Sequence, residues 1–494
     1  MSAPPARSDP TLARLAEAVL IPPFPGSSAP RWIRHALGRG MAGVTLFGQN
    51  VVSPDQVRRL TAALRSAAAD ADPVIAIDEE GGDVTRVAYA DGSPYPGNAA
   101  LGVVDDVPLT RAVYAAIGRD LAALGINLDL APCADVLGTA DSPAVGTRSF
   151  GAGTGLVARH TVAAVAGLQG AGVAACTKHF PGHGRTRTDS HEAVAVIDGT
   201  LDDLRRNDLP PFLAAIGAQT AAIMPGHLRL PELTGRLPAT VSAAALTGLL
   251  RGELGFTGVI ISDALEMRAT RDMFGIPGAA VRAVAAGADL LCLGRDGREA
   301  DYLAVRDALV AAVRDRALPG ERLEEAAGRV ARLRGSLRRH RISGAAPAAD
   351  GDVGLAAARR AARIWGARPT LVAPVIVEVE PRENIAAGRF AWGLGPWADG
   401  VRRVESRDGS GRADAAPGIL AAAAGRSLVA VVRDAHRDAG TRSLLTALLA
   451  ARPDTVLVEM GLPLWRPPEG TCYVATYGAS RASAQAAAEL LGLA

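Results

Sequence analysis

The stretch VAACTKHFPGHGRTRTDSH, residues 173–191, decides how the chain is interpreted. Its first part, 173–180, is short and almost continuously apolar, which is typical of a strand buried on both faces. Its second part, from Pro181 onward, is broken by proline and glycine and therefore predicts a loop. A loop that follows a buried strand is a place where catalytic side chains are held on a rigid base.

Seven further apolar runs of the same kind accompany this stretch, and Ala-rich amphipathic segments separate most of them. Eight strand-like runs alternating with helical patterns predict a (β/α)8 TIM barrel of the α/β class. A doubly wound open sheet is the alternative. The runs are VLIPPF (19–24), GVTLFG (43–48), PVIAID (73–78), INLDLAP (126–132), VAACTKHF (173–180), AAIMPGH (221–227), GVIISDA (258–264) and ADLLCLG (288–294).

The chain is predicted to contain two domains. Residues 341–354 are mostly small or polar, with glycine and proline among them, and they predict a linker. We therefore expect a TIM-barrel catalytic domain at 1–342 and a smaller C-terminal α/β sandwich domain at 355–494. The Arg-rich stretch 322–341 is expected to be a solvated helix face rather than a nucleic-acid patch. The second domain has strand-like runs at 370–379, 427–434, 454–460 and 471–478, with helical patterns at 440–451 and 480–493.

Composition excludes several classes of protein. The 494 residues are 49% hydrophobic and 21% charged, which is ordinary for a globular chain and excludes disorder of the whole. A net charge of +2 is too balanced for a protein that holds nucleic acid by charge alone. The sequence shows neither a membrane span nor a secretory signal, so we expect a cytoplasmic protein without a membrane partner. Four scattered cysteines are expected to be reduced core thiols.

Ionisable side chains follow the apolar runs at their C-terminal ends. In a barrel these ends face one common mouth, and burying so many charges costs stability unless they are paired or used. Lys178 is the single lysine among the 53 lysines and arginines. An ammonium differs chemically from a guanidinium, so a chain with this bias is expected to keep a lysine where arginine could not replace it; chance retention is the alternative. The residues at strand ends are Asp78, Asp135, Lys178, His179, His227 and Asp263.

The segment 178–191 allows three interpretations. His179 and His183 are four residues apart and suggest a zinc site, but Pro181 and the neighbouring glycines exclude the helix that this spacing requires. A structural loop with incidental histidines is a second interpretation. In the third, which we favour, Asp189 meets an imidazole nitrogen of His191 across a turn, so that the histidine donates and then accepts a proton near neutral pH.

Acid–base work needs a nucleophile or a stabilising group opposite. Asp263 ends the seventh run, where its carboxylate can attack an electrophilic carbon or stabilise a cation. A helix N-cap, with Ser262 as the other candidate, is the alternative role. Asp78 and Arg148 fit a polyhydroxylated ligand because a carboxylate and a guanidinium can share vicinal hydroxyls. For Arg148 the alternative is an ordinary surface arginine.

Taken together, the motifs resemble those of glycoside hydrolase family 3, specifically its β-N-acetylhexosaminidase branch. They match in order and register across roughly residues 15–300. The family pattern usually has glutamine and arginine where this chain has Glu79 and Asp83. The segments that carry the resemblance are LFGQN (46–50), IDEEGG with Arg86 (77–82 and 86), APCADV (131–136), GTRSFG (146–151), KHFPGHG with DSH (178–184 and 189–191), MPGH (224–227) and SDALEM (262–267).

The resemblance implies a retaining exo-β-N-acetylglucosaminidase that cleaves terminal β-linked N-acetylglucosamine through a covalent glycosyl-enzyme intermediate. It implies that Asp263 is the nucleophile and that His191 is the acid–base residue, with Asp189 as its partner. It implies neither a metal nor an organic cofactor. With the expected cytoplasmic location, it also implies a part in cell-wall (peptidoglycan) recycling. The matching sugar-binding positions are Asp78, Arg86, Arg148, Lys178 and His179.

Three other functions remain open from sequence. One is a β-N-acetylglucosaminide phosphorylase, because a histidine acid places no fixed anion where phosphate would arrive. Another is a β-glucosidase of the same fold. The third is a carbohydrate-binding protein on an inactive barrel, which the presence of Asp263, Asp189 and His191 argues against.

Overall fold

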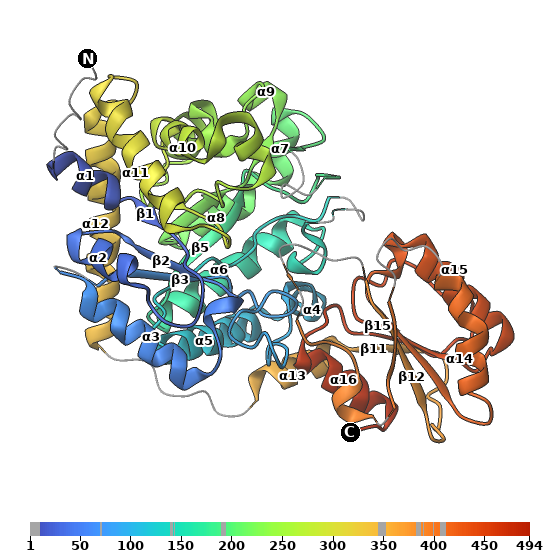
Figure 1. Ribbon diagram of the computed structural model, residues 1–494. Helices are drawn as coiled ribbons and strands as arrows, with labels where there is room; N and C mark the ends of the chain where they lie inside the picture. Colours follow the sequence, from blue (N-terminus) through green and yellow to red (C-terminus); the bar gives the residue numbers. More distant parts are fainter. Residues whose placement is uncertain are drawn as a thin grey trace, which may run out of the picture.

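Eight short parallel strands form the centre of the N-terminal lobe in this computed structural model (Figure 1). The structure describes residues 10–69, 72–138, 142, 144–188, 194–343, 352–381, 387–388, 390–398, 400–405 and 412–494. The strands coincide with the eight predicted apolar runs. They are β1 (Leu20–Ile21), β2 (Gly43–Leu46), β3 (Val74–Ile77), β4 (Leu128–Asp129), β5 (Ala174–Phe180), β7 (Ala222–Pro225), β9 (Val259–Ile260) and β10 (Leu291–Cys292).

Backbone pairing closes these strands into a ring. Six of them form a parallel sheet in the order β2-β3-β4-β5-β7-β9, and β1 pairs in parallel with β10. A parallel bridge between Ile261 and Leu290 joins β9 to β10, and the Thr45 amide donates to the Pro22 carbonyl at 3.3 Å between β2 and β1. The predicted TIM barrel is therefore confirmed, and the open-sheet alternative is wrong for this lobe.

Helices surround the barrel and explain the continuous apolar character of the strands. Ile75 and Ile77 belong to the core that includes the helices, whereas Val74 and Ala76 belong to a second cluster with side chains from the other strands. Each strand is thus buried on both faces. The helices are α1 (Pro10–Glu17), α2 (Arg31–Arg39), α3 (Pro54–Ala67), α4 (Asn98–Val104), α5 (Val107–Ala123), α6 (Thr154–Gly170), α7 (Leu201–Asn207), α8 (Leu209–Gly217), α9 (Pro231–Thr234), α10 (Arg268–Ala286), α11 (Glu299–Arg314) and α12 (Gly320–Ser343).

Short elements complete this lobe. The β6 strand (Ala195–Val196) pairs with β8 (Leu228–Arg229), and the π-helical segment η4 (Ala244–Glu253) lies between β8 and β9. Three short 3-10 helices, η1 (Gly48–Asn50), η2 (Gly146–Arg148) and η3 (Ala239–Val241), lie in the connections between strands.

The Arg-rich helix α12 is more than a solvated face. Val330, Leu333 and Leu337 join the cluster formed by the strands, so one side of the helix packs against the barrel. On the same helix, Arg322 donates to Asp289 at 2.6 Å. The helix also continues to Ser343, three residues into the predicted linker; residues 344–351 lie outside the described part of the chain.

A second sheet forms the C-terminal lobe, in the order β11-β16-β15-β14-β12-β13, with β11 antiparallel to an otherwise parallel set. Its strands are β11 (Arg363–Trp365), β12 (Val375–Val379), β13 (Arg402–Val404), β14 (Leu428–Val432), β15 (Val456–Glu459) and β16 (Tyr473–Ala475). Its helices are α13 (Val353–Ala361), α14 (Ala416–Ala422), α15 (Ala439–Ala451) and α16 (Arg481–Leu491), with 3-10 turns at η5 (Gly395–Trp397), η6 (Arg412–Ala415) and η7 (Ala435–Arg437).

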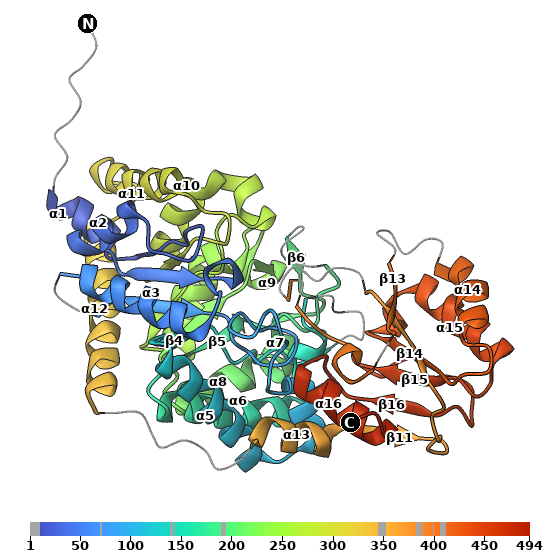
Figure 2. The same cartoon turned by 60° about the horizontal axis from the view of Figure 1, so that its bottom comes forward.

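Helices cover both faces of this second sheet, as expected for an α/β sandwich. Side chains of α16 pack in one hydrophobic cluster, and those of α14 and α15 pack in another. The α13 and α16 helices pack against each other at the junction with the barrel (Figures 1 and 2), where α13 also contacts α4 and α5. The four cysteines are free and buried, and no described helix is both long and apolar enough to cross a bilayer.

Candidate active site

The single lysine lies between two carboxylates at the C-terminal end of the strands. Lys178 is in β5, and its Nζ lies 2.5 Å from Asp78 Oδ1 and 2.7 Å from Glu80 Oε1. Only 3% of the lysine side chain is exposed. Burial alone would lower the pKa of Lys178, but Asp78 and Glu80 outweigh it and raise that pKa above its ordinary value. Lys178 is therefore a fixed cation.

Arg148, from η2, binds the other side of Glu80. Its Nη2 donates to Glu80 Oε1 at 2.6 Å and its Nε donates to Oε2 at 2.9 Å, a bidentate pair. Burial would raise the pKa of Glu80, but Arg148 and Lys178 hold it well below its ordinary value. With 8% of its side chain exposed, Arg148 is a buried residue of the site, and the surface alternative is wrong.

Asp78 is the most exposed of these charged side chains, with 20% of its side chain exposed. Burial would raise the pKa of Asp78, but Lys178 and Arg86 hold it below its ordinary value. Arg86 Nη2 lies 3.8 Å from Asp78 Oδ2. The same guanidinium donates through Nη1 to the carbonyl of Ala387, in the C-terminal lobe, at 3.1 Å. Arg86 thus connects the cluster to the second lobe.

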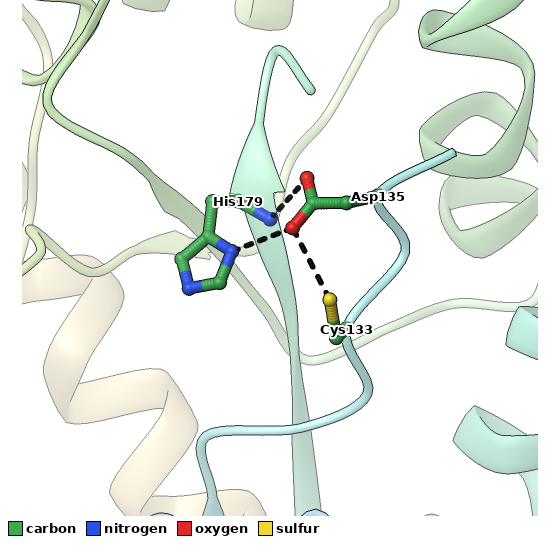
Figure 3. A group of neighbouring side chains, drawn as sticks. All are labelled: Cys133, Asp135 and His179. Atoms are coloured by element: carbon green, nitrogen blue, oxygen red, sulfur yellow. Dashed lines mark hydrogen bonds and ion pairs between the residues drawn. The ribbon is translucent and has the colours of Figure 1, made fainter. Parts of the chain in front are cut away.

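A second hydrogen-bonded group centres on Asp135 (Figure 3). A parallel bridge between Cys133 and Lys178 brings this segment beside β5. Asp135 Oδ2 lies 2.7 Å from His179 Nδ1 and accepts from Cys133 Sγ at 3.1 Å. Asp135 Oδ1 accepts from the amides of His179 and His183, at 3.2 and 2.7 Å. Burial would raise the pKa of Asp135, but His179 holds it below its ordinary value.

These contacts assign the tautomer of His179. Arg148 Nη2 lies 3.3 Å from His179 Nε2, and a guanidinium can only donate, so Nε2 accepts. Nδ1 then carries a proton and donates to Asp135, which fixes the orientation of the ring. His179 is therefore locked between Arg148 and Asp135.

Cys133, Asp135 and His179 are also residue types that can bind a metal, and among the described residues one potential ligand atom of each lies within 4.8 Å of those of the other two. Their polar atoms already satisfy each other, because the thiol and the imidazole N–H both donate to the carboxylate. Burial, followed by the nearby Asp135 charge, raises the pKa of the Cys133 thiol well above its ordinary value, which favours the protonated form over a metal-binding thiolate. His183 turns its Nδ1 to Thr186 Oγ1 at 2.6 Å instead.

Asp263 follows β9 on the same end of the barrel and is half-buried. Its Oδ1 accepts from the next amide, that of Ala264, at 2.7 Å, and α10 begins only at Arg268. The N-cap alternative is therefore wrong for Asp263. His227, from the neighbouring strand end, fixes this turn, since its Nε2 lies 2.9 Å from the Ala264 carbonyl.

The carboxylates at these strand ends affect the pKa values of the same buried thiols. Burial is the main reason that the pKa of the Cys176 thiol is raised, and Asp78 and Asp263 add to it while Lys178 opposes it. Asp78 and Asp263 also raise the pKa of Cys292, after burial and Glu266. The aspartates therefore lie within electrostatic range of the same two thiols, from opposite sides of the barrel.

The predicted acid–base pair, Asp189 and His191, lies outside the described residues. The first residues of that loop, which the structure describes, are held by an ion pair and a backbone bridge. Arg185 Nη2 lies 2.6 Å from Asp208 Oδ2, and Thr186 forms an antiparallel bridge with Ile197. Burial raises the pKa of Asp208 to about 7.

Sequence reasoning did not assign a role to Glu80 or Asp135, although each is the hub of one hydrogen-bonded group. A signal for Glu80 was present, because residues 78 and 80 are two apart at a strand end and can point the same way. Asp135 was noted at a strand end, but the sequence has no signal that His179, 44 residues away, would be its partner.

Comparisons with known proteins agree on one family. The sequence profile described as Glycosyl hydrolase family 3 N terminal domain matches residues 27–333. The chain is 36% identical over 270 residues to Beta-hexosaminidase A of Pseudoalteromonas piscicida, and this match covers 51% of this chain and 45% of that protein. It is 37% identical over 265 residues to a Beta-hexosaminidase of Stenotrophomonas maltophilia (strain K279a), covering 53% of this chain and 77% of the relative.

A solved structure matches nearly the whole chain. A glycoside hydrolase family 3 beta-N-acetylglucosaminidase from Paenibacillus sp. str. FPU-7 superposes with a TM-score of 0.84 at 30% identity, and the match covers 98% of this chain and 97% of the other. The likeness therefore includes both lobes.

Proposed function

The chain belongs to glycosyl hydrolase family 3, a family of glycosidases, and on that basis we propose that it is a retaining exo-β-N-acetylglucosaminidase. The observation that carries the proposal is the buried array of Asp78, Lys178, Glu80 and Arg148 at the mouth of the barrel, with Asp263 on the same face. Fixed charges that can share hydrogen bonds with vicinal hydroxyls suit a sugar.

In the proposed reaction Asp263 is the nucleophile. Its carboxylate forms a bond to the anomeric carbon while the bond from that carbon to the leaving oxygen breaks, and the leaving oxygen takes a proton from His191. His191, now neutral, then accepts a proton from water as that water attacks the anomeric carbon and releases the sugar from Asp263. Asp189 stabilises the imidazolium. The parts of Asp189 and His191 rest on the family resemblance.

The remaining residues hold the sugar. We assign this part to Asp78, Arg86, Arg148, Lys178 and His179. Support comes from their fixed charges and positions: Lys178 and Arg148 are permanent cations, Asp78 is a carboxylate, and His179 is held between Arg148 and Asp135. Because these groups are already in place, reorganising the site costs little free energy when the substrate binds.

Turnover of nitrophenyl N-acetyl-β-glucosaminide, compared with the β-glucoside, tests the activity. We expect turnover of the former and little of the latter; the reverse preference would favour a β-glucosidase, and turnover of neither would favour a binding protein. Adding phosphate gives a further arm, since formation of sugar 1-phosphate would show a phosphorylase.

The nucleophile has its own test. Asp263→Asn is expected to lower kcat by about a thousandfold or more while leaving thermal unfolding unchanged. Asp272→Asn, at an exposed carboxylate nearby on α10, is the matched control and should retain full activity. A fluorinated N-acetylglucosaminyl substrate should label the peptide that contains Asp263, as detected by mass spectrometry. Retained activity in Asp263→Asn would remove this residue from the proposal.

The natural substrate that we propose is a cell-wall fragment that ends in β-linked N-acetylglucosamine, processed in the cytoplasm. The test is release of N-acetylglucosamine from purified peptidoglycan fragments. Failure on these fragments, with activity on the nitrophenyl glycoside, would leave the reaction and change the substrate.

A further inference from the structure

The turn that carries Glu80 is held at its other end by the C-terminal lobe. Gly81 and Gly82 have φ values of +74° and +60°, which lets the chain reverse tightly after β3. The Glu80 amide donates to the Val84 carbonyl at 3.0 Å, closing the turn. Glu80 binds Arg148 and Lys178, whereas Val84 is 2% exposed and belongs to the hydrophobic core of the second lobe. One turn therefore belongs to both lobes.

Asp83, in the middle of this turn, accepts hydrogen bonds from both lobes. Its Oδ2 accepts from Thr147 Oγ1, in the barrel lobe, at 2.9 Å and from Arg433 Nη2, in the second lobe, at 3.1 Å. Its Oδ1 accepts from the amide of Ala479, also in the second lobe, at 2.7 Å. The carboxylate is largely buried, so each of these bonds is shielded from water.

Arg433 is itself confined. Its guanidinium lies over the rings of Phe390 and Trp392, 4.7 and 5.4 Å from their centroids. Aromatic faces hold a cation in place and exclude water from it. The pair of Arg433 with Asp83 is thus a fixed junction rather than a loose surface contact.

The Asp83 junction acts on both partners of the Glu80–Arg148 pair. Thr147 directly precedes Arg148 in η2, so its bond to Asp83 fixes the backbone that carries the guanidinium. Asp83 is also three residues from Glu80 within the closed turn. The two members of the bidentate pair are therefore placed by the same carboxylate.

We propose that Asp83 is a positioning residue through which the second lobe sets the place of the Glu80–Arg148 pair for sugar binding. The proposal rests on the proposed function for its substrate. It assigns to the second lobe a part in preparing the site that does not require the lobe to touch the sugar.

Three variants, made in the full chain, test whether Asp83 connects the second lobe to the Glu80–Arg148 pair. Thr147→Val removes the hydroxyl on the barrel side at nearly constant volume, whereas Asp83→Asn and Arg433→Gln weaken the junction itself. Each is expected to raise KM for the N-acetylglucosaminide about fivefold to tenfold, the loss of roughly one hydrogen bond, with kcat within about twofold. Thr147→Ser keeps the hydroxyl and should restore the wild-type KM.

A matched control distinguishes an effect of the Asp83 contacts from a general weakening of the contact between the lobes. Arg360→Gln breaks another ion pair between the lobes, Arg360 Nη1 with Asp106 Oδ2 at 2.7 Å, at a more exposed place. Its KM should stay within about twofold of wild type. An equal rise in KM for Arg360→Gln, or an unchanged KM for Thr147→Val, would overturn the proposal.

Amide hydrogen exchange supplies a readout that needs no substrate. The peptide 144–150 should exchange faster in Thr147→Val and Asp83→Asn than in wild type or in Arg360→Gln. Unchanged exchange would overturn the inference even if the wild-type enzyme were inactive on N-acetylglucosaminides. Wild-type inactivity together with faster exchange would instead count against the proposed function alone.

Discussion

Replacing Glu80 with glutamine removes the carboxylate that two buried cations share. Arg148 then loses its bidentate carboxylate pair, at 2.6 and 2.9 Å, and keeps the Ala144 carbonyl at 2.8 Å and His179 Nε2 at 3.3 Å. Lys178 keeps Asp78. One buried cation is left without a counter-charge, and breaking a buried pair in this way costs about 3–5 kcal/mol of unfolding free energy. Because Arg148 keeps one carbonyl, we expect a loss near 3 kcal/mol.

Urea unfolding at pH 7 measures this loss. Glu253→Gln is the matched control, because Glu253 pairs with Arg205 at 3.0 Å and both side chains are nearly half exposed. Such exposed pairs contribute about 0–1 kcal/mol. If Glu80→Gln cost no more than Glu253→Gln, the buried array would not be the fixed and strongly coupled unit that we describe.

The same variant has an expected pH dependence. The pKa of Glu80 in the folded chain is held below the ordinary 4.5, so its stabilising contribution is fully present above about pH 4.5. The contribution is lost as the pH falls through the folded pKa, when the carboxylate takes up a proton. The difference between wild type and Glu80→Gln should therefore be constant from pH 7 to about pH 5 and shrink below it. A difference that grows on acidification would contradict this.

Three further outcomes are expected. His191→Ala should lower turnover of alkyl N-acetylglucosaminides by about a hundredfold or more and that of nitrophenyl glycosides far less, because an activated leaving group needs little protonation; equal losses would argue against a proton donor. Asp135→Asn should lower the unfolding free energy by about 1–3 kcal/mol and raise KM, since His179 loses the acceptor that fixes its tautomer; an unchanged KM would separate His179 from sugar binding. Burial raises the pKa of Glu266 to about 7, so the folded chain holds a proton that the unfolded chain releases near 4.5, and stability from this group falls as the pH rises between those values. Glu266→Gln should flatten that fall in urea unfolding measured from pH 4.5 to 8, and an unaltered slope would contradict the burial effect.

The barrel could be predicted because every one of its strands is buried on both faces and leaves a continuous apolar run. The two strands that were missed in the second lobe, β11 and β13, are short and lie at the edges of their sheet. Edge strands need not be apolar, and β13 begins with two arginines. The pattern that identifies a central strand is therefore absent from them.

The grouping of ionisable residues at the strand ends could be predicted from the sequence more fully than the contacts between them. Placing ionisable residues at strand ends was enough to bring Asp78, Lys178 and His179 together, since parallel strands end at one rim. It was not enough to show that Arg148 is buried, because its partner Glu80 is 68 residues away. Long-range pairing of charges depends on where loops fold back, which local sequence does not encode.

The loop that follows β3 has a consequence for cooperativity. Val84 is part of the second lobe's core, Tyr89 packs against that core, and the Tyr89 carbonyl accepts from the Ala391 amide at 3.3 Å. The C-terminal lobe therefore completes its interior with side chains that belong to the barrel. Calorimetry of the intact chain should accordingly give one melting transition, since neither half can lose its structure without uncovering apolar surface in the other.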